Sequence, residues 1–172
     1  MDRGDPFKDD ALFKHNLYAK GKSSYVLGNK PDVDCILCAV RDDDARVVVK
    51  KLYEDEIAIV MLNLYPFNPG HSLIVPCRHV ERWRDLNEGE VKVITSLVGK
   101  VQDLLESELG ATSFNVGMNE GPCSGASIDH LHVHVVPRFK NEIGFIDNVA
   151  KTRAVIFNID ELHDKLKNKM AR

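Results

Sequence analysis

The chain has 172 residues, of which 44% are hydrophobic and 28% charged, and its net charge is −3. This length is sufficient for one domain whose core needs no disulfides. The small negative charge, without a basic stripe, argues against binding to a nucleic-acid backbone. No apolar run approaches the ~20 residues of a membrane span, and none follows a basic N-terminal segment, so we expect a cytoplasmic protein with no membrane partner.

The chain divides into three parts by composition. Residues 1–34 are mixed and charged, and we interpret them as an N-terminal extension with one short helix at 9–18. Residues 35–150 contain the recognisable motifs and form the expected domain. Residues 151–172 are a tail in which apolar residues at helical spacing, from Asp160 onwards, predict a short helix.

Two β-rich runs, at 47–49 and 57–62, are separated by the charged residues 54–56. Their composition predicts neighbouring antiparallel strands. The segment 63–70 contains two prolines, two asparagines and a glycine, which is typical of a turn, and 71–77 predicts the next strand.

The clearest element is a long helix. Residues 87–90 resemble a capping box, apolar residues follow at helical spacing, and Gly110 is a stop signal. Residues 112–118 predict another strand, and 119–129 form a loop rich in glycine and serine. Together these elements predict an α+β fold, with an antiparallel sheet of about five strands, one long helix and smaller terminal helices.

Three histidines recur at alternate positions after this loop. Because side chains alternate between the two faces of a β-strand, His130, His132 and His134 would share one face, ~6.6 Å apart from one to the next. The apolar residues between them would face the core. A half-buried strand usually carries solvated residues on its polar face, so the row indicates a functional site. The alternative is three solvent-facing or hydrogen-bonded core histidines.

The histidine row fits two kinds of chemistry. A His-x-His pair can bind zinc, but the outer two histidines would lie ~13 Å apart, too far for one ion with ligands at ~2.1 Å. Histidine also forms covalent intermediates, and its reference pKa of ~6.5 leaves it largely neutral near pH 7. Its central position makes His132 the natural nucleophile.

The segment 130–136, His-Leu-His-Val-His-Val-Val, resembles the signature of the histidine-triad family of nucleotide hydrolases and nucleotidyl transferases. Residues 62–76 resemble the family's upstream strand, turn and strand, and 114–127 its phosphate loop, so the resemblance covers about 35–138. Residues 63–71 are most similar to the branch of diadenosine tetraphosphate phosphorylases and dinucleoside polyphosphate hydrolases. The resemblance implies an enzyme with a small-molecule nucleotide substrate, and a homodimer formed through the long helix and an edge strand.

Cys35 and Cys38 form a Cys-x-x-Cys pair, which in a reducing compartment indicates a metal or redox site rather than a structural disulfide. The resemblance adds His79 and His130, because related proteins bind zinc through such a pair, a histidine after a strand end and the first triad histidine. Four ligands leave no open position, so the implied zinc is structural. The alternative is that the cysteines are small buried hydrophobic residues and His79 is a surface residue.

The loop before the triad has the composition of an anion cradle, because glycines allow close backbone approach and Ser127 offers a hydroxyl. The nucleotide- and phosphate-binding residues implied by the resemblance are Asn63, Asn119, Gly125, Ala126, Ser127, His130 and His134. From the residues alone, Asn63 is equally a turn former and His71 a solvated strand start. His15 and His163 lie in charged segments and are expected in solvent, and Cys123 is left open.

The resemblance implies double displacement at the α-phosphorus of a nucleotide. His132 attacks, Ser127 holds a phosphate oxygen, and His134 and His71 stabilise the charge. The carbonyl of His130 would fix the tautomer of His132.

The nature of the acceptor separates the possible activities. Water gives hydrolysis of dinucleoside polyphosphates or nucleoside phosphoramidates, and inorganic phosphate gives phosphorolysis. The branch resemblance favours phosphorolysis of diadenosine tetraphosphate to ADP and ATP, with His71, Ser124 and Arg138 as candidate donors to the second anion. Two other functions stay open: a zinc-stabilised nucleotide-binding or adaptor protein, and a metalloenzyme using the triad itself. The intact His132 favours nucleotidyl transfer.

Overall fold

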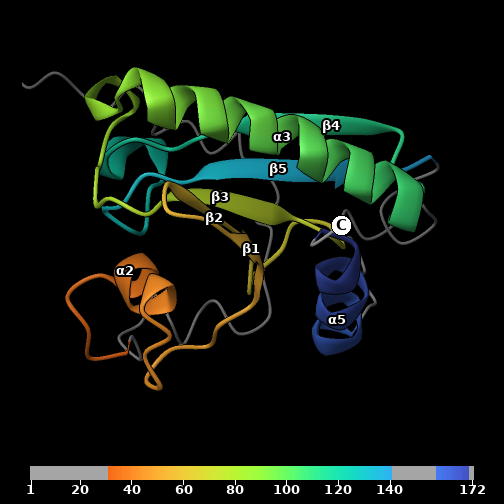
Figure 1. Cartoon of the computed structure of the whole chain (residues 1–172), viewed down its shortest axis with the longest axis horizontal. Coiled ribbons are helices and arrows are strands. Elements are labelled where there is room, and N and C mark those ends of the chain that lie inside the picture. Colours follow the sequence, from red (N-terminus) through yellow and green to blue (C-terminus); the bar gives the residue numbers. More distant parts are fainter. Residues whose placement is uncertain (1–30, 141–157, 171–172) are drawn as a thin grey trace, which may run out of the picture.

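The computed structural model describes residues 31–140 and 158–170. Within these ranges the chain forms a five-stranded antiparallel sheet in the order β1-β2-β3-β5-β4. The strands are β1 (Lys51–Glu54), β2 (Ala58–Leu62), β3 (Ser72–Pro76), β4 (Ser113–Gly117) and β5 (Val133–Arg138). The helices are α2 (Ile36–Arg41), α3 (Glu88–Leu109) and α5 (Ile159–Met170), with the 3-10 turns η1 (Trp83–Asp85) and η2 (Pro122–Ser124) (Figure 1). The α+β prediction is therefore confirmed, while the helix predicted at 9–18 lies outside the described residues.

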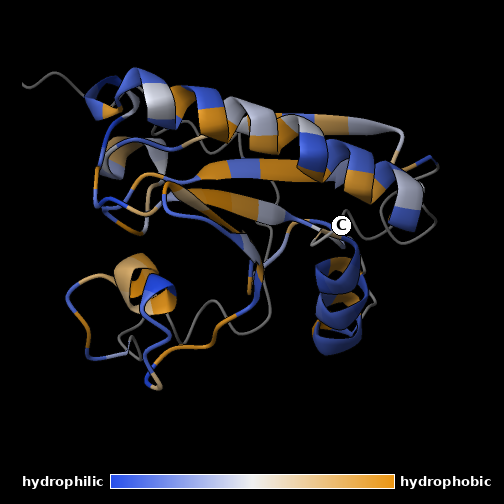
Figure 2. Ribbon diagram, in the orientation of Figure 1, coloured by the Kyte–Doolittle hydropathy of each residue, from blue (hydrophilic) through white to orange (hydrophobic). Residues whose placement is uncertain are grey.

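The long helix α3 begins and ends where the sequence predicts. The side chain of Asn87 accepts a hydrogen bond from the backbone N–H of Glu90, and the Glu90 carboxylate accepts one from the N–H of Asn87. At the other end Gly110 has φ 68°, the left-handed conformation that closes many helices. Capping determines the ends of α3, and its apolar side chains pack against one face of the sheet (Figure 2).

Alternate residues of the central strands face two separate cores. Val60 and Ile74 pack under α3, whereas Met61 and Leu73 pack on the opposite face against Leu37 of α2. Leu73 is paired with His134 across β3 and β5. Because directly paired residues project from the same face of a sheet, His134 lies on the α2 face.

The strand predicted at 47–49 is wrong, because β1 begins only at Lys51. The ammonium of Lys51 is buried and donates to the carbonyl oxygen of Arg41 and to the carboxylates of Asp43 and Glu54. A buried ammonium needs acceptors for all three protons, and two of these acceptors lie at the end of α2 and in the loop that follows it. This anchoring determines the path of the chain between α2 and β1, which the β propensity of three valines does not predict.

The short helix predicted in the tail is confirmed as α5, which packs on β1 and α3 through Leu162 and Leu166. The prediction that His163 is in solvent is wrong. Its Nε2 donates to the carbonyl oxygen of Lys51 at 2.9 Å, and its side chain is 12% exposed. The edge of the sheet needs donors for such carbonyls, and α5 supplies one. No helix in the described ranges is long and apolar enough to cross a membrane, and His15 lies outside them.

Candidate active site and metal cluster

The three triad histidines divide between two sites. β5 begins at Val133, so His130 and His132 precede the ladder. The N–H of Leu131 bonds to the carbonyl of Val80 at 2.6 Å instead of to a neighbouring strand. The expectation of one strand carrying all three histidines is therefore wrong. His130 contacts the cysteine pair, whereas the rings of His132 and His134 lie 4.9 Å apart, centroid to centroid.

His132 and His134 line a pocket of about 250 Å³ on the α2 side of the sheet. Its apolar wall includes Leu37 and Val40 of α2 and Met61 and Leu73 of the sheet. The predicted nucleotide-binding residues that line it are Asn63, Asn119, Gly125, Ala126, Ser127 and His134. A pocket with both an apolar wall and a polar group suits a ligand with a base and a phosphate.

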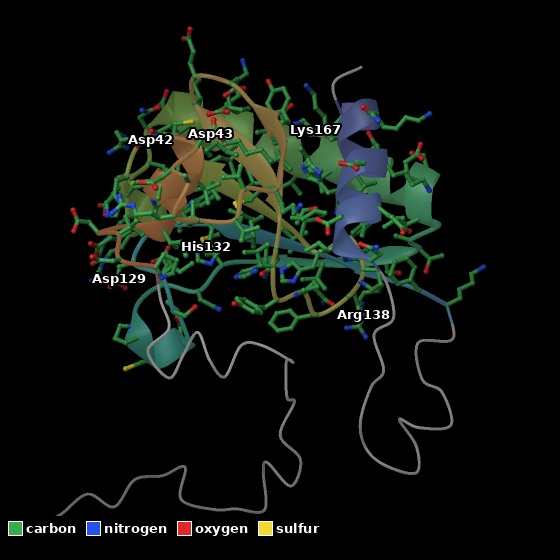
Figure 3. All side chains as sticks on the ribbon, turned by 90° about the horizontal axis from the view of Figure 1, so that it is seen from below. Asp42, Asp43, Asp129, His132, Arg138 and Lys167 are labelled. Carbon is green, nitrogen blue, oxygen red and sulfur yellow. The ribbon has the colours of Figure 1, made fainter. Side chains whose placement is uncertain are left out.

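Two of the candidate donors to a second anion lie elsewhere. Arg138 ends β5, six residues beyond His132, which corresponds to about 20 Å along an extended chain. Figure 3 shows these two residues well separated along the sheet. Ser124 does not line the pocket, and its hydroxyl donates to the carbonyl of Gly121 at 2.8 Å. Arg138 was a candidate donor only if its side chain turned toward the site, and its place at the end of β5 puts it outside the pocket lining.

The orientation of His132 is fixed by the main chain. Its Nδ1 lies 2.7 Å from the carbonyl oxygen of His130. A carbonyl only accepts, so Nδ1 carries the proton and Nε2 holds a lone pair. Burial lowers the pKa of His132, although the hydrogen bond to this carbonyl acts in the opposite direction. The lowered pKa keeps the imidazole neutral near pH 7. A neutral, oriented imidazole beside a polar pocket has the properties of a nucleophile.

His71 lies behind His134 and does not line the pocket. It is 1% exposed, so it is not a solvated strand start. Its Nε2 is 2.9 Å from Nδ1 of His134. His71 therefore contacts a residue of the pocket wall, His134, but does not line the pocket itself.

The loop between β4 and the triad turns at two glycines. Gly121 and Gly125 have φ 76° and 86°, the region that side chains with a Cβ rarely adopt. The carboxylate of Glu120 accepts a hydrogen bond from the backbone N–H of Trp83 at 2.8 Å, which ties the start of the loop to η1. Cys123 is an exposed free thiol in η2.

The predicted metal ligands form one cluster. The ligand atoms of Cys35, Cys38, His79 and His130 all lie within 4.8 Å of one another. Sγ of Cys35 is 3.3 Å from Nδ1 of His130, and Sγ of Cys38 is 3.4 and 3.5 Å from Nδ1 of His79 and His130. Sulfur and nitrogen ligands of a tetrahedral zinc lie about 3.5 Å apart, so the donor set and its spacing fit this ion.

The surroundings of the cluster also fit a metal. Nε2 of His130 lies 3.0 Å from the carbonyl oxygen of Pro76, so it carries the proton and leaves Nδ1 deprotonated for a ligand bond. Burial lowers the pKa of His130 to about 4, which keeps the ring neutral. The N–H of Cys38 points to the sulfur of Cys35 at 3.4 Å.

Comparison with known proteins agrees with this geometry. A family model described as the HIT domain matches residues 45–141, more than half of the chain. The chain belongs to the HIT family. The AP-4-A phosphorylase of Mycobacterium tuberculosis is 34% identical over 115 residues, which are 66% of this chain and 57% of that protein. The bis(5'-nucleosyl)-tetraphosphatase [asymmetrical] of Schizosaccharomyces pombe is 35% identical over 97 residues, 56% of this chain and 53% of that protein.

Both HIT relatives are named as enzymes, and this chain's matches span little more than half of their lengths. Among solved structures, a Zn-bound histidine triad family protein from Mycobacterium smegmatis is 25% identical, with a TM-score of 0.67. That likeness covers 80% of this chain and 94% of the other.

The sequence interpretation missed three residues that line this HIT pocket. Leu37 and Val40 of α2 were not predicted to line it, although apolar residues three apart around the cysteine pair are a helical signal. Phe67 was treated only as part of a turn, yet it lines the pocket and its ring stacks on His71.

Proposed function

We propose that this HIT protein cleaves a nucleotide phosphoanhydride by forming a covalent nucleotidyl intermediate on Nε2 of His132. The observation that carries the proposal is the 2.7 Å contact between Nδ1 of His132 and the carbonyl of His130. This contact leaves the Nε2 lone pair for attack, in a residue that lines a pocket of mixed apolar and polar character.

The chemistry has two balanced steps. In the first, the lone pair of His132 Nε2 forms a bond to the α-phosphorus, and the bond from phosphorus to the bridging oxygen breaks with its electrons leaving on the departing polyphosphate. Ser127 and the amides near Gly125 hold the phosphate oxygens, and His134 donates a hydrogen bond to the negative charge that develops on them. In the second step an acceptor oxygen attacks the same phosphorus, and the P–N bond breaks with its electron pair returning to Nε2 of His132. Where water is the acceptor, its proton is released to solvent.

We further propose that inorganic phosphate is the acceptor and that the substrate is diadenosine tetraphosphate, which then yields ADP and ATP. Similarity to a protein named AP-4-A phosphorylase supports this choice. Hydrolysis to AMP and ATP is the second candidate, which similarity to a named tetraphosphatase supports. The first step is common to both, so the acceptor alone distinguishes them.

Zinc would hold the cluster of two cysteines and two histidines in a structural role, with His130 as the ligand that adjoins the active site. A bound zinc would fix the position of His130. The carbonyl of His130 then presents a rigid acceptor to His132. The homodimer implied by the family resemblance stays a prediction.

The test is to incubate the purified protein with diadenosine tetraphosphate, with and without inorganic phosphate, and to identify the nucleotides formed. Phosphorolysis predicts ADP and ATP in amounts that depend on phosphate. AMP and ATP, formed even at high phosphate, would establish hydrolysis instead. Binding without any product would favour a nucleotide-binding or adaptor protein.

A further inference from the structure

The turn between β2 and β3 holds an aromatic residue against a buried histidine. Phe67 is 48% exposed and lines the pocket, while one face of its ring stacks on His71 with centroids 5.0 Å apart and planes 19° from parallel. The turn itself is anchored, because the buried amide of Asn68 donates to the carbonyl of Pro137 at 2.6 Å. The stacked ring is therefore a wall between His71 and solvent.

The main chain of Phe67 determines which nitrogen of His71 carries the proton. Its backbone N–H donates to Nδ1 of His71 at 3.1 Å. Since Nδ1 accepts, the proton of His71 lies on Nε2, which donates to Nδ1 of His134 at 2.9 Å. His134 in turn accepts at Nδ1 and carries its own proton on Nε2. One backbone amide thus sets the tautomers of two successive histidines.

Asn63 restrains the same ring. Its Oδ1 accepts from the N–H of Tyr65 at 2.9 Å, which directs the NH₂ group toward His71. Nδ2 lies 3.4 and 3.5 Å from the two nitrogens of His71. An atom in the ring plane at equal distances from both would collide with Cε1, so the amide lies against a face of the imidazole. Contacts at its edges and a face hold the ring in one orientation.

We propose that Phe67 is a positioning residue for the reaction, which holds His71 in the Nε2–H tautomer and thereby makes His134 an Nε2–H donor at the pocket. The inference rests on the proposed nucleotidyl transfer. Without the stacked ring of Phe67, water can reach the imidazole of His71, and the imidazole can rotate by half a turn. This rotation exchanges a nitrogen for a carbon at the contact with His134. The backbone N–H alone does not prevent that rotation, whereas the ring of Phe67 together with Asn63 does.

The experiment compares Phe67→Ala, Phe67→Leu and Phe67→Tyr with the control Val116→Ala. Val116 is also an exposed apolar residue, but it lies on β4 and does not line the pocket. We expect Phe67→Ala to lower kcat about tenfold, corresponding to one misplaced donor, with Phe67→Tyr restoring it and Phe67→Leu in between. Val116→Ala should leave kcat and KM within about twofold.

A second readout does not depend on turnover. In ¹⁵N-histidine NMR of the resting protein, His71 should show a protonated Nε2 and an unprotonated Nδ1 in the wild type and in Phe67→Tyr. In Phe67→Ala these signals should broaden or shift to a mixture of tautomers. A wild-type tautomer in Phe67→Ala, or equal kcat losses in Phe67→Ala and Val116→Ala, would overturn the proposal. Failure of the proposed function would appear instead as activity that survives the loss of His132.

Discussion

Nδ1 of His132 lies 2.7 Å from the carbonyl oxygen of His130, and the ring of that same His130 belongs to the cluster with Cys35 and Cys38. The main-chain and side-chain groups of one residue therefore serve two sites. The ring of His130 is fixed by the cysteines and by the carbonyl of Pro76. Fixing this ring also fixes the peptide group whose carbonyl orients His132. The Cys/His cluster and the proposed nucleophile are coupled through this single residue.

Replacement of the proposed nucleophile should separate catalysis from binding. We expect His132→Asn to reduce turnover to less than about 3% of the wild-type rate, because the covalent step is removed. The affinity for an adenine nucleotide should remain within a few-fold, since the rest of the pocket lining is unchanged. Steady-state kinetics and calorimetric titration measure the two quantities, and substantial residual turnover would refute the assignment.

The cysteine pair should determine metal content and stability together. We expect the wild-type protein to contain about one zinc per chain, and Cys35→Ser/Cys38→Ser to contain none, with a loss of stability on the order of several kcal/mol. Elemental analysis and thermal unfolding check this result. Cys77→Ser and Cys123→Ser are matched controls, because these two thiols lie outside the cluster. Undiminished zinc in the double variant would show that the ion binds elsewhere.

Two glycines should respond in opposite directions to alanine. Gly70 has φ 86°, and a Cβ there would lie 2.7 and 2.8 Å from side-chain atoms of Leu109 and Leu105. Gly70→Ala should therefore lower the free energy of unfolding by about 2 to 4 kcal/mol. Gly99 lies within α3 with nothing within 4 Å of its Cβ position, so Gly99→Ala should raise it by about 0.5 to 1 kcal/mol. Chemical denaturation measures both, and equal effects would contradict this packing.

The buried Glu90 should make stability depend on acid pH. The guanidinium of Arg78 bonds both carboxylate oxygens, at 2.9 and 2.7 Å, and holds the pKa of Glu90 below its usual value. A lowered folded pKa means that this stabilisation is fully present above the unfolded pKa of about 4.3 and is lost as the pH falls through the folded value.

The variant Glu90→Gln isolates this effect. We expect it to be less stable than the wild type by about 1 to 2 kcal/mol near pH 7. The difference should shrink as the pH falls below about 4. Denaturation curves across this range measure it, and a constant difference would mean that Glu90 acts through packing rather than charge.

The sequence was most informative where one local rule decides the structure. The capping box at Asn87 and the stop at Gly110 predicted the ends of α3, and the period-two histidines predicted that Val133 and Val135 face the core. The sequence predicted a strand beginning at His130, whereas β5 begins at Val133. His130 instead contacts the distant cysteine pair, and this contact overrides strand periodicity. Such a requirement comes from tertiary contacts that a local pattern does not contain.

The errors share the same origin. The run at 47–49 has strong β propensity, yet two acceptors of the buried Lys51 lie at the end of α2 and in the loop after it, and they determine the local path. His163 lies in a charged segment, but its Nε2 reaches a main-chain carbonyl of β1. The stacking of Phe67 on His71 follows from the shape of a turn, which composition alone does not give. In each case the local structure is determined by a contact that the sequence pattern does not contain, either between residues far apart in the chain or within a turn.

The most direct test of the nucleotidyl-histidine mechanism is to trap the intermediate. The protein is mixed with diadenosine tetraphosphate without inorganic phosphate, and denatured at alkaline pH, where a phosphorus–nitrogen bond of this kind survives. Peptide mass spectrometry then locates any adenylyl group. The mechanism predicts one adenylyl group on the peptide at His132 in the wild type and none in His132→Asn. An adduct on another residue, or turnover without an adduct at any quench time, would contradict it.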